Sequence, residues 1–190
     1  HLGCGKRRIS GFVNVDIDSH CEPDYIADVF ALNSFRATFH GVAKEIPALG
    51  SIDLIYACHV LEHAGRHEYK AVLKRWHEVL KPGGVLRLSV PDLGVVMEHY
   101  AISYLSFEPM DKYLGFLYGG QRDGYDYHKM GWDEASLTRD LIEAGFRDVH
   151  RYDRWKTEHA EVDDYSAAYL PHLNFSNGRL MSLNVEAVRA

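Results

Sequence analysis

The most regular segment of the chain is residues 66–80, where apolar side chains recur at the three- and four-residue spacing of a helix. Lys81-Pro82-Gly83-Gly84 follows directly, and this combination is typical of a helix end. Short runs of β-branched and apolar residues elsewhere predict strands. The expected strands are one ending at Leu2 and those over residues 12–17, 25–27, 52–57, 85–90, 149–152 and 180–188, and the other expected helices cover residues 93–104, 109–118 and 133–144.

This alternation of strands and helices predicts an α/β fold with a mostly parallel sheet and helices on both faces. A chain of 190 residues is long enough for a single domain over residues 1–190. Ligands of such sheets bind at the carboxyl ends of the strands. The residues that directly follow the predicted strands, and are therefore the first candidates for a site, are Gly3–Gly5, Asp16–Asp18, Asp28, Cys58–His63 and Asp92.

Composition narrows the range of partners. Lysine and arginine number 21 against 27 aspartates and glutamates, a net charge of −6, which argues against nucleic acid or an anionic membrane as the main partner. No apolar run approaches the roughly 18 residues of a membrane span. Cys4, Cys21 and Cys58 are spaced too irregularly for a disulfide framework or a metal knuckle. We therefore expect a cytoplasmic protein that acts on a small molecule.

Three short features carry candidate binding chemistry. Gly3-Cys4-Gly5 follows the first strand, and its two glycines let the backbone approach a ligand without a Cβ clash, although a plain turn is the alternative. Asp16 closes the second strand, where a carboxylate can accept hydrogen bonds from both hydroxyls of a ribose or simply be solvated. Asp28 could accept a hydrogen bond from an adenine amino group or cap a helix.

Four segments, taken in order, resemble the class I, Rossmann-like, S-adenosylmethionine-dependent methyltransferases: LGCG, VNVDID, DLIYACHVLEH and VLKPGGVLRLSVPD. The last two are the most specific of the four. Two further segments, YDYHKMGWDEASLTRDLIEAGFRDVHRYD and SLNVEA, resemble a bacterial subgroup linked to surface polysaccharide or sugar modification. The resemblance implies a Rossmann-like three-layer sandwich, with a mostly parallel seven-stranded sheet whose last strand is antiparallel.

The resemblance also implies S-adenosylmethionine as the cofactor and S-adenosylhomocysteine as its product. The two glycines would lie against the methionine part, Asp16 would hold the ribose, and Asp28 would meet the adenine edge. Cys58 and His59 would face the amino acid or sulfonium region. The positions that match the cofactor-binding motifs are Gly3, Cys4, Gly5, Asp16, Ile17, Asp28, Val29, Cys58 and His59.

The sequence departs from the family pattern near its start. Arg7 stands where the third glycine of the motif usually lies. Only residues 6–11 separate the glycine turn from the second strand, whereas a parallel crossover needs roughly a dozen residues or more. We therefore expect the first helix to be shortened or absent. Because the chain opens at the end of a strand, we also expect that a few residues precede His1 in the natural protein.

A competing motif overlaps the third segment. Residues 59–63 read H-x-x-E-H, the inverted zinc-peptidase signature, in which two histidines on one helix face bind zinc. The motif is short, the chain has 12 histidines, a strand precedes it, and Gly65 follows it almost at once. No further carboxylate ligand is marked by the sequence. We therefore expect no metal site, and in the methyltransferase interpretation His63 faces the substrate or caps the helix.

Methyl transfer to a hydroxyl is helped by a general base whose pKa lies near the working pH, which suits histidine. The candidates are His63, His128 and His159. His128 lies in the loop over residues 119–131, whose aromatic and charged residues suit a sugar, although a solvated loop residue is an equal alternative. His159 follows the penultimate strand and has the same two interpretations.

The sequence therefore predicts a methyltransferase that methylates a hydroxyl or amine of a small polar acceptor, in particular a sugar or polysaccharide precursor. The elements expected on the acceptor side are residues 93–131 and 153–178. Two alternatives remain open. One is an inactive S-adenosylmethionine-binding module with an assembly or regulatory role, and the other is a nicotinamide-dependent oxidoreductase on a related fold.

Overall fold

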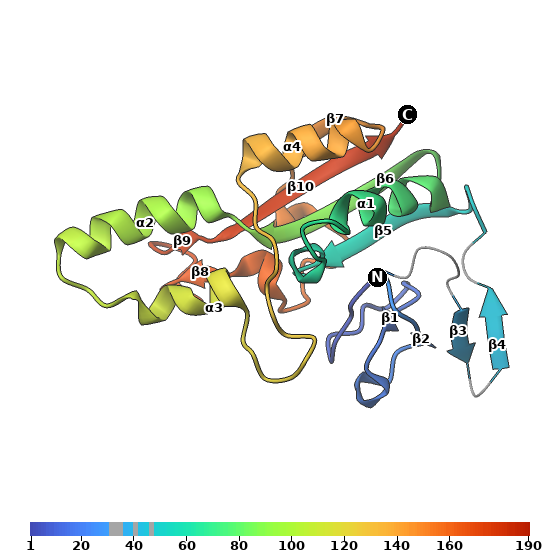
Figure 1. Ribbon diagram of the computed structural model, residues 1–190, viewed down its shortest axis with the longest axis horizontal. Coiled ribbons are helices and arrows are strands. Elements are labelled where there is room, and N and C mark those ends of the chain that lie inside the picture. Colours follow the sequence, from blue (N-terminus) through green and yellow to red (C-terminus); the bar gives the residue numbers. More distant parts are fainter. Residues whose placement is uncertain (31–35, 40–41, 46–47) are drawn as a thin grey trace.

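The computed structural model describes residues 1–30, 36–39, 42–45 and 48–190, and it places short strands and helices in alternation (Figure 1). The strands are β1 (Val15–Asp16), β2 (Tyr25–Ile26), β3 (Arg36–Phe39), β4 (Val42–Glu45), β5 (Ile52–Cys58), β6 (Leu80–Pro91), β7 (Phe146–Arg151), β8 (Tyr169–Leu170), β9 (Arg179–Leu180) and β10 (Ser182–Arg189). The α-helices are α1 (Tyr69–Val79), α2 (Leu93–Leu105), α3 (Leu114–Tyr118) and α4 (Glu134–Glu143). The 3₁₀-helices are η1 (Ser19–Cys21), η2 (Leu61–His63), η3 (Met110–Tyr113), η4 (Arg154–Lys156) and η5 (Tyr165–Ala167).

The central sheet is mixed. One group of strands has the order β1-β2-β3-β4 and the other has the order β5-β6-β10-β7. Leu2 joins the two groups, because it bridges in parallel to Val15 on one side and to Ala57 on the other. The pairs β1–β2 and β5–β6 are parallel, whereas β10 runs antiparallel to both of its neighbours. The expected α/β fold is confirmed, but the antiparallel β3–β4 hairpin was not predicted.

Alternation along β5 defines the two faces of the sheet. Ile55 and Ala57 belong to the main core together with the apolar stripe of α1, including Trp76. Helix α4 packs on the same face, so α1 and α4 form one layer (Figure 1). Tyr56 and Cys58 point to the opposite face, as the two-residue period of a strand requires.

The opposite face differs from the expected three-layer sandwich. In the part of the chain that the structure describes, it is covered by the loop over residues 5–12 and by residues 154–167 rather than by α-helices. The Tyr56 hydroxyl donates to Asp164 Oδ2 over 2.6 Å, and the Tyr56 ring lies 4.2 Å from that of His159. Residues 6–11 form turns and loop without a helix, so the expectation of a shortened or absent first helix is confirmed.

Several strands differ in their bounds from the predictions: β7 begins three residues early, and the last predicted strand is divided into β9 and β10. The strand expected over residues 12–17 is reduced to β1, because the Asn14 side chain bonds the Ile9 backbone and holds the preceding residues in a loop. Strand β6 starts already at Leu80, and its pairing with β5 shifts where residues 81–84 bulge out. A Cβ at Gly84 would press on the Lys81 carbonyl oxygen, so glycine is required there.

Helices α2 and α3, with η3 between them, extend from one end of the sheet as an arm (Figure 1). These helices match the two predicted over residues 93–104 and 109–118, except that the second begins with a 3₁₀ turn. Asp92 caps α2 through the Val95 backbone N–H and pairs with Arg151 at 2.9 Å. Among the described residues, no helix combines the length and the apolar character needed to cross a bilayer.

Candidate functional site

The carboxyl ends of Leu2, β1, β2 and β5 meet at one edge of the sheet. Gly3 and Gly5 form the turn after Leu2, with φ angles of 61° and 50° that disfavour any side chain. A Cβ on Gly3 would overlap Cγ2 of Val60, whereas a Cβ on Gly5 would meet nothing within 4 Å. The glycine at position 3 is therefore required for packing, and the one at position 5 borders open space.

Asp16 is fixed beside this turn. Its Oδ2 accepts the Gly5 backbone N–H over 2.7 Å, and its Oδ1 accepts the Asp18 N–H over 2.9 Å. The residue is only 9% exposed. Because each carboxylate oxygen can accept more than one hydrogen bond, both oxygens remain able to accept a ligand hydroxyl. This donor–acceptor pattern fits a ribose that lies over the glycine turn.

The neighbouring sequence candidates lie in different environments. Asp28 is exposed, with Oδ1 accepting the Phe30 N–H over 2.9 Å, and Ile17 is 37% exposed. Val29 is buried in the main core, and its carbonyl accepts from Trp76 Nε1 at 3.3 Å. Asp28 and Ile17 can therefore present side chains to an adenine, whereas Val29 has only its backbone to offer. We call Gly3, Gly5, Asp16, Ile17 and Asp28 the glycine–aspartate edge.

The two cysteine candidates are buried. Burial, together with the nearby Asp16 carboxylate, raises the pKa of the Cys4 thiol to about 12. Cys58 packs with Ile9 and Tyr56 on the face opposite α1, and burial raises the pKa of its thiol well above the usual value. Neither thiol is therefore ionised near neutral pH, and Cys58 does not point toward the helix-covered face.

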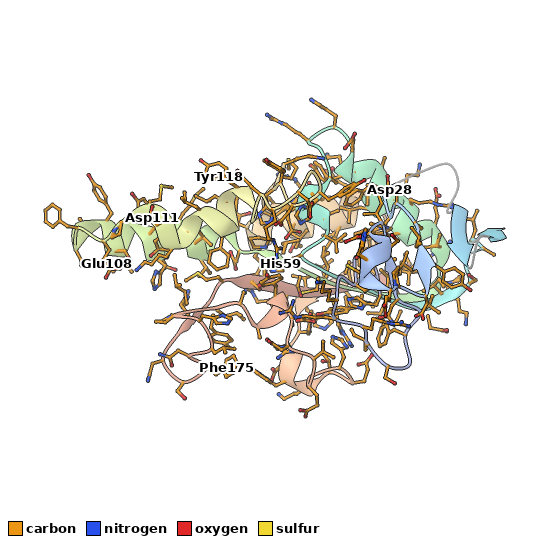
Figure 2. The ribbon with its side chains drawn as sticks, turned by 90° about the horizontal axis from the view of Figure 1, so that it is seen from below. Asp28, His59, Glu108, Asp111, Tyr118 and Phe175 are labelled. Atoms are coloured by element: carbon orange, nitrogen blue, oxygen red, sulfur yellow. The ribbon has the colours of Figure 1, made fainter. Side chains whose placement is uncertain are left out.

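A second feature of this edge is a cavity of about 350 Å³. Figure 2 shows His59 in the middle of the molecule, with Asp28 to one side and the helical arm that carries Glu108 and Asp111 to the other. We call this space the histidine cavity. Its lining residues come from the position after β5, from η2, from α3, from the loop over residues 119–131 and from η5: His59, His63, Gly115, Phe116, Gly120, Arg122, Asp126, His128 and Tyr165.

His59 occupies an unusual backbone conformation at the end of β5, with a φ of 53°. Its Nε2 lies 2.7 Å from Ser182 Oγ, and that hydroxyl donates to the Tyr165 carbonyl over 2.5 Å. Since a hydroxyl has one proton to donate, His59 Nε2 must be the donor to Ser182. Nδ1 of His59 is then a lone pair, 3.2 Å from Glu62 Oε1.

His63 and His128 both line the histidine cavity. Nδ1 of His63 donates to the Tyr127 carbonyl over 3.1 Å, and Nδ1 of His128 donates to the Phe116 carbonyl over 3.0 Å. Carbonyl oxygens only accept, so in the neutral rings each Nε2 carries a lone pair. Burial is the main cause of a lowered pKa for both imidazoles, which favours these neutral forms.

Glu62 lies beneath the histidines and is completely buried. Neither of its carboxylate oxygens has a hydrogen-bond partner among the described residues, since the contact with His59 lacks bonding geometry. Burial raises the pKa of this carboxyl to about 8 and lowers that of His59 to about 3. The sequence marked Glu62 only as part of the H-x-x-E-H motif, and nothing in the sequence placed His128 beside it.

The structure does not bring His159 to this cavity. Its ring packs against Tyr56 and Phe12 on the other face of the sheet, and Arg87 Nη1 lies 3.3 Å from its Nδ1. The zinc-peptidase interpretation requires both histidines of the motif on one helix. The structure has no such helix there, because His59 has a positive φ and residues 61–63 form a single 3₁₀ turn. His63 and His128 are therefore the sequence candidates that the fold unites.

A larger cavity, of about 560 Å³, lies elsewhere in the molecule. It reaches the start of β5 at Ser51 and Ile52 and is lined mainly by apolar residues that include Trp76 and Val79. Ligands of α/β sheets bind at the carboxyl ends of the strands, and the start of β5 is the opposite end. Size alone therefore does not make it the functional site.

Comparison with known proteins identifies the family. A family model described as a methyltransferase domain matches residues 2–151, about four-fifths of the chain. Among solved structures, an S-adenosylmethionine-dependent methyltransferase from Archaeoglobus fulgidus is 14% identical, with a TM-score of 0.54, over 99% of this chain and 84% of that one. At this identity the similarity concerns the fold.

A second similar structure is the 1,6-didemethyltoxoflavin-N1-methyltransferase of Burkholderia thailandensis, 17% identical with a TM-score of 0.40, which covers 76% of this chain. The present chain spans 47% of the length of that protein. No curated protein sequence matches. On the strength of the family match, which covers most of its length, the chain belongs to the methyltransferase domain family.

Proposed function

We propose that this protein transfers a methyl group from S-adenosylmethionine to a hydroxyl or amine of a small polar acceptor. The main support for the proposal is that the glycine–aspartate edge and the histidine cavity adjoin each other. Gly3 packs against Val60, the residue directly after His59, so the glycine–aspartate edge adjoins the histidine cavity. A cofactor bound at the glycine–aspartate edge can therefore present its methyl group to an acceptor in the histidine cavity.

The cofactor assignment is supported by the glycine–aspartate edge. The open space over Gly5 accommodates the methionine part, the lone pairs of Asp16 accept the ribose hydroxyls, and Asp28 with Ile17 meets the adenine. The strand order is compatible with this assignment, since the parallel strands β1, β2, β5 and the bridge at Leu2 lie side by side, although β3 and β4 extend the mixed sheet beyond the seven strands that were expected. We infer a cytoplasmic location from the three free thiols, which suit a reducing compartment.

The acceptor assignment is supported by the histidine cavity. Its volume of about 350 Å³ is near the lower end of the range for small-molecule sites. Phe116 and Tyr165 offer aromatic faces, and the Arg122–Asp126 ion pair, 2.6 Å long, offers donors and acceptors. Aromatic faces with charged groups beside them suit a sugar, which is the acceptor class we propose.

Bound S-adenosylmethionine supplies an activated methyl group on a sulfonium. The task of the chain is to hold the acceptor in line with that group and to stabilise its oxygen or nitrogen as the proton leaves. The Nε2 lone pairs of His63 and His128 are available for this, because both Nδ1 atoms are already used by backbone carbonyls. His59 is less suited, since its two nitrogens face Ser182 and Glu62.

The first test is calorimetric titration with S-adenosylhomocysteine, with NAD as the control ligand. We expect one equivalent of S-adenosylhomocysteine to bind with micromolar affinity or better, and NAD not to bind. Binding of NAD, or of neither ligand, would overturn the cofactor assignment. A screen of nucleotide sugars by mass spectrometry for a gain of one methyl group then tests the acceptor. Binding without turnover on any hydroxyl or amine acceptor would favour the inactive module.

A further inference from the structure

We propose that Glu62, His63 and His128 bind a divalent transition-metal ion at the floor of the histidine cavity. One ligand atom from each of these side chains lies within 4.8 Å of the others, and Glu62 Oε1 is 3.9 Å from His128 Nε2. The sequence predicts no metal site, because no further ligand accompanies the short H-x-x-E-H motif, and His128 lies 65 positions beyond His63. Only the fold brings the three together.

The backbone fixes this arrangement. The Glu62 carbonyl accepts the N–H groups of Lys129 and Met130 over 2.8 and 3.1 Å, which ties the loop that carries His128 to the turn that carries His63. Each histidine is held in addition by its Nδ1–H bond to a carbonyl. Metal-binding histidines typically donate the second ring N–H in this way, since it fixes the tautomer and aims the lone pair.

The unsatisfied carboxylate oxygens of Glu62 are a second indication of a bound cation, independent of the distances between the ligand atoms. Glu62 is fully buried and neither of its oxygens has a hydrogen-bond partner among the described residues. The nearest nitrogen is Nδ1 of His59, and that atom is itself a lone pair because Nε2 serves Ser182. When Glu62 is ionised, two acceptors thus face each other across 3.2 Å, and an unpaired buried carboxylate is costly. A cation bound to Glu62, His63 and His128 would remove the cost at the carboxylate.

Donor chemistry selects the class of ion. Two imidazole nitrogens with one carboxylate suit Zn²⁺, Fe²⁺, Mn²⁺ or Co²⁺, whereas Ca²⁺ and Mg²⁺ prefer oxygen ligands. Metal–ligand bonds of roughly 2.0–2.1 Å place two tetrahedral ligands about 3.4 Å apart. The Glu62–His128 pair would close by about half an ångström from its 3.9 Å separation, and the widest pair of the three, which lies within 4.8 Å, would close by up to about 1.4 Å.

Three protein ligands leave at least one coordination position open, as in catalytic metal sites. That position faces the cavity in which the proposed function places the acceptor. If that function holds, the ion would take the place of the two histidine lone pairs: it would bind the acceptor hydroxyl and lower its pKa, so an oxygen acceptor would be preferred over an amine. This role rests on the proposed function, but metal binding itself does not.

The test is metal binding by the full chain, freed of any affinity tag and treated with a chelator. Zn²⁺ is titrated by calorimetry, and Co²⁺ is followed by its visible absorption. We expect one tight equivalent, together with a higher midpoint of thermal unfolding when Zn²⁺ is present. Glu62→Gln and His128→Ala should each weaken binding at least 100-fold and abolish the thermal shift. His63→Ala supplies a third variant should one of the others fail to fold.

His150→Ala is the matched control. His150 also donates through Nδ1 to a carbonyl and has a carboxylate 3.7 Å from Nε2, but it lies on the exposed part of β7. Its loss should leave the tight equivalent unchanged. Absence of a tight site in the wild type, or equal binding by the cavity variants, would overturn the proposal. A shared proton, rather than a cation, would then be what satisfies the Glu62 carboxylate. S-adenosylhomocysteine titration of the metal-free protein tests the cofactor site separately.

Discussion

The two glycines of the first turn should respond differently to the same substitution. Gly3→Ala places a methyl group into Cγ2 of Val60, and it also forces alanine into a φ of 61°. Gly5→Ala imposes a similar φ of 50°, but its methyl group meets nothing within 4 Å. The second variant therefore measures backbone strain alone, and the difference between the two measures the clash.

The magnitudes follow from these contacts. Left-handed backbone costs a non-glycine residue roughly 1–2 kcal/mol, so Gly5→Ala should lower the free energy of unfolding by about that amount. Overpacking adds about 1–3 kcal/mol at Gly3, because Val60 is buried and its branched side chain is stiff. Gly3→Ala should therefore cost about 2–5 kcal/mol, a large part of a typical domain stability.

Urea unfolding of Gly3→Ala, Val60→Ala and the double variant completes a thermodynamic cycle. Truncation of Val60 leaves only its Cβ, 3.5 Å from the added methyl group, which is an ordinary contact. The double variant should thus be about 1–3 kcal/mol more stable than the sum of the single effects predicts. Additive effects, or equal destabilisation by Gly3→Ala and Gly5→Ala, would refute the packing described here.

S-adenosylhomocysteine binding should rank Gly3→Ala and Gly5→Ala in the opposite order to stability. If the cofactor occupies the open space over Gly5, the methyl group of Gly5→Ala should weaken S-adenosylhomocysteine binding at least tenfold, although this variant is the more stable one. Calorimetry on the folded protein measures the change. Unaltered affinity would show that the ligand does not lie over Gly5, and would count against the proposed cofactor site.

Three further predictions concern the rest of the site. His128→Ala removes a lone pair from the histidine cavity without touching the glycine–aspartate edge, so turnover should fall at least tenfold while S-adenosylhomocysteine affinity stays within about twofold; lost affinity would contradict its position. Asp16→Asn cannot accept from both Gly5 and Asp18, so urea unfolding should show a loss of about 1–3 kcal/mol and calorimetry a cofactor affinity at least tenfold weaker; wild-type values for both would remove this carboxylate from the site. The native thiols should react with Ellman's reagent at pH 8 roughly a hundredfold more slowly than those of the urea-unfolded protein. Burial raises the pKa of Cys21 to about 11, so its thiolate and its reaction rate should increase as the pH rises toward that value; rapid native reaction at pH 8 would be inconsistent with this.

Local chemistry was enough to predict much of the fold. The apolar period of residues 66–80 predicted α1, although the helix ends at Val79 and the glycines after Lys81 lie in the bulged start of β6. Asp133 and Ser136 form the capping box of α4, and Gly145 follows that helix, so its bounds were close to those expected. The short segment between Gly5 and Phe12 excluded a crossover helix by length alone. These features depend on neighbours within a few residues, which the sequence displays directly.

The gathering of candidate binding residues at the ends of strands was also predictable, because the parallel topology brings strand ends to one edge. Gly3, Gly5 and Asp16 lie together for this reason. The sequence could not show that Val29 and Cys58 turn away, because which side of a short strand faces the core depends on its register with its neighbours.

Only the tertiary structure decided the composition of the histidine cavity. His63 and His128 are 65 positions apart, and they meet because backbone bonds from Lys129 and Met130 close the intervening loop onto Glu62. His159 instead packs against Tyr56 on the face of the sheet opposite α1. Local periodicity specified the elements of this protein, whereas long-range hydrogen bonds and burial specified which side chains meet, since such contacts leave no regular spacing in the sequence.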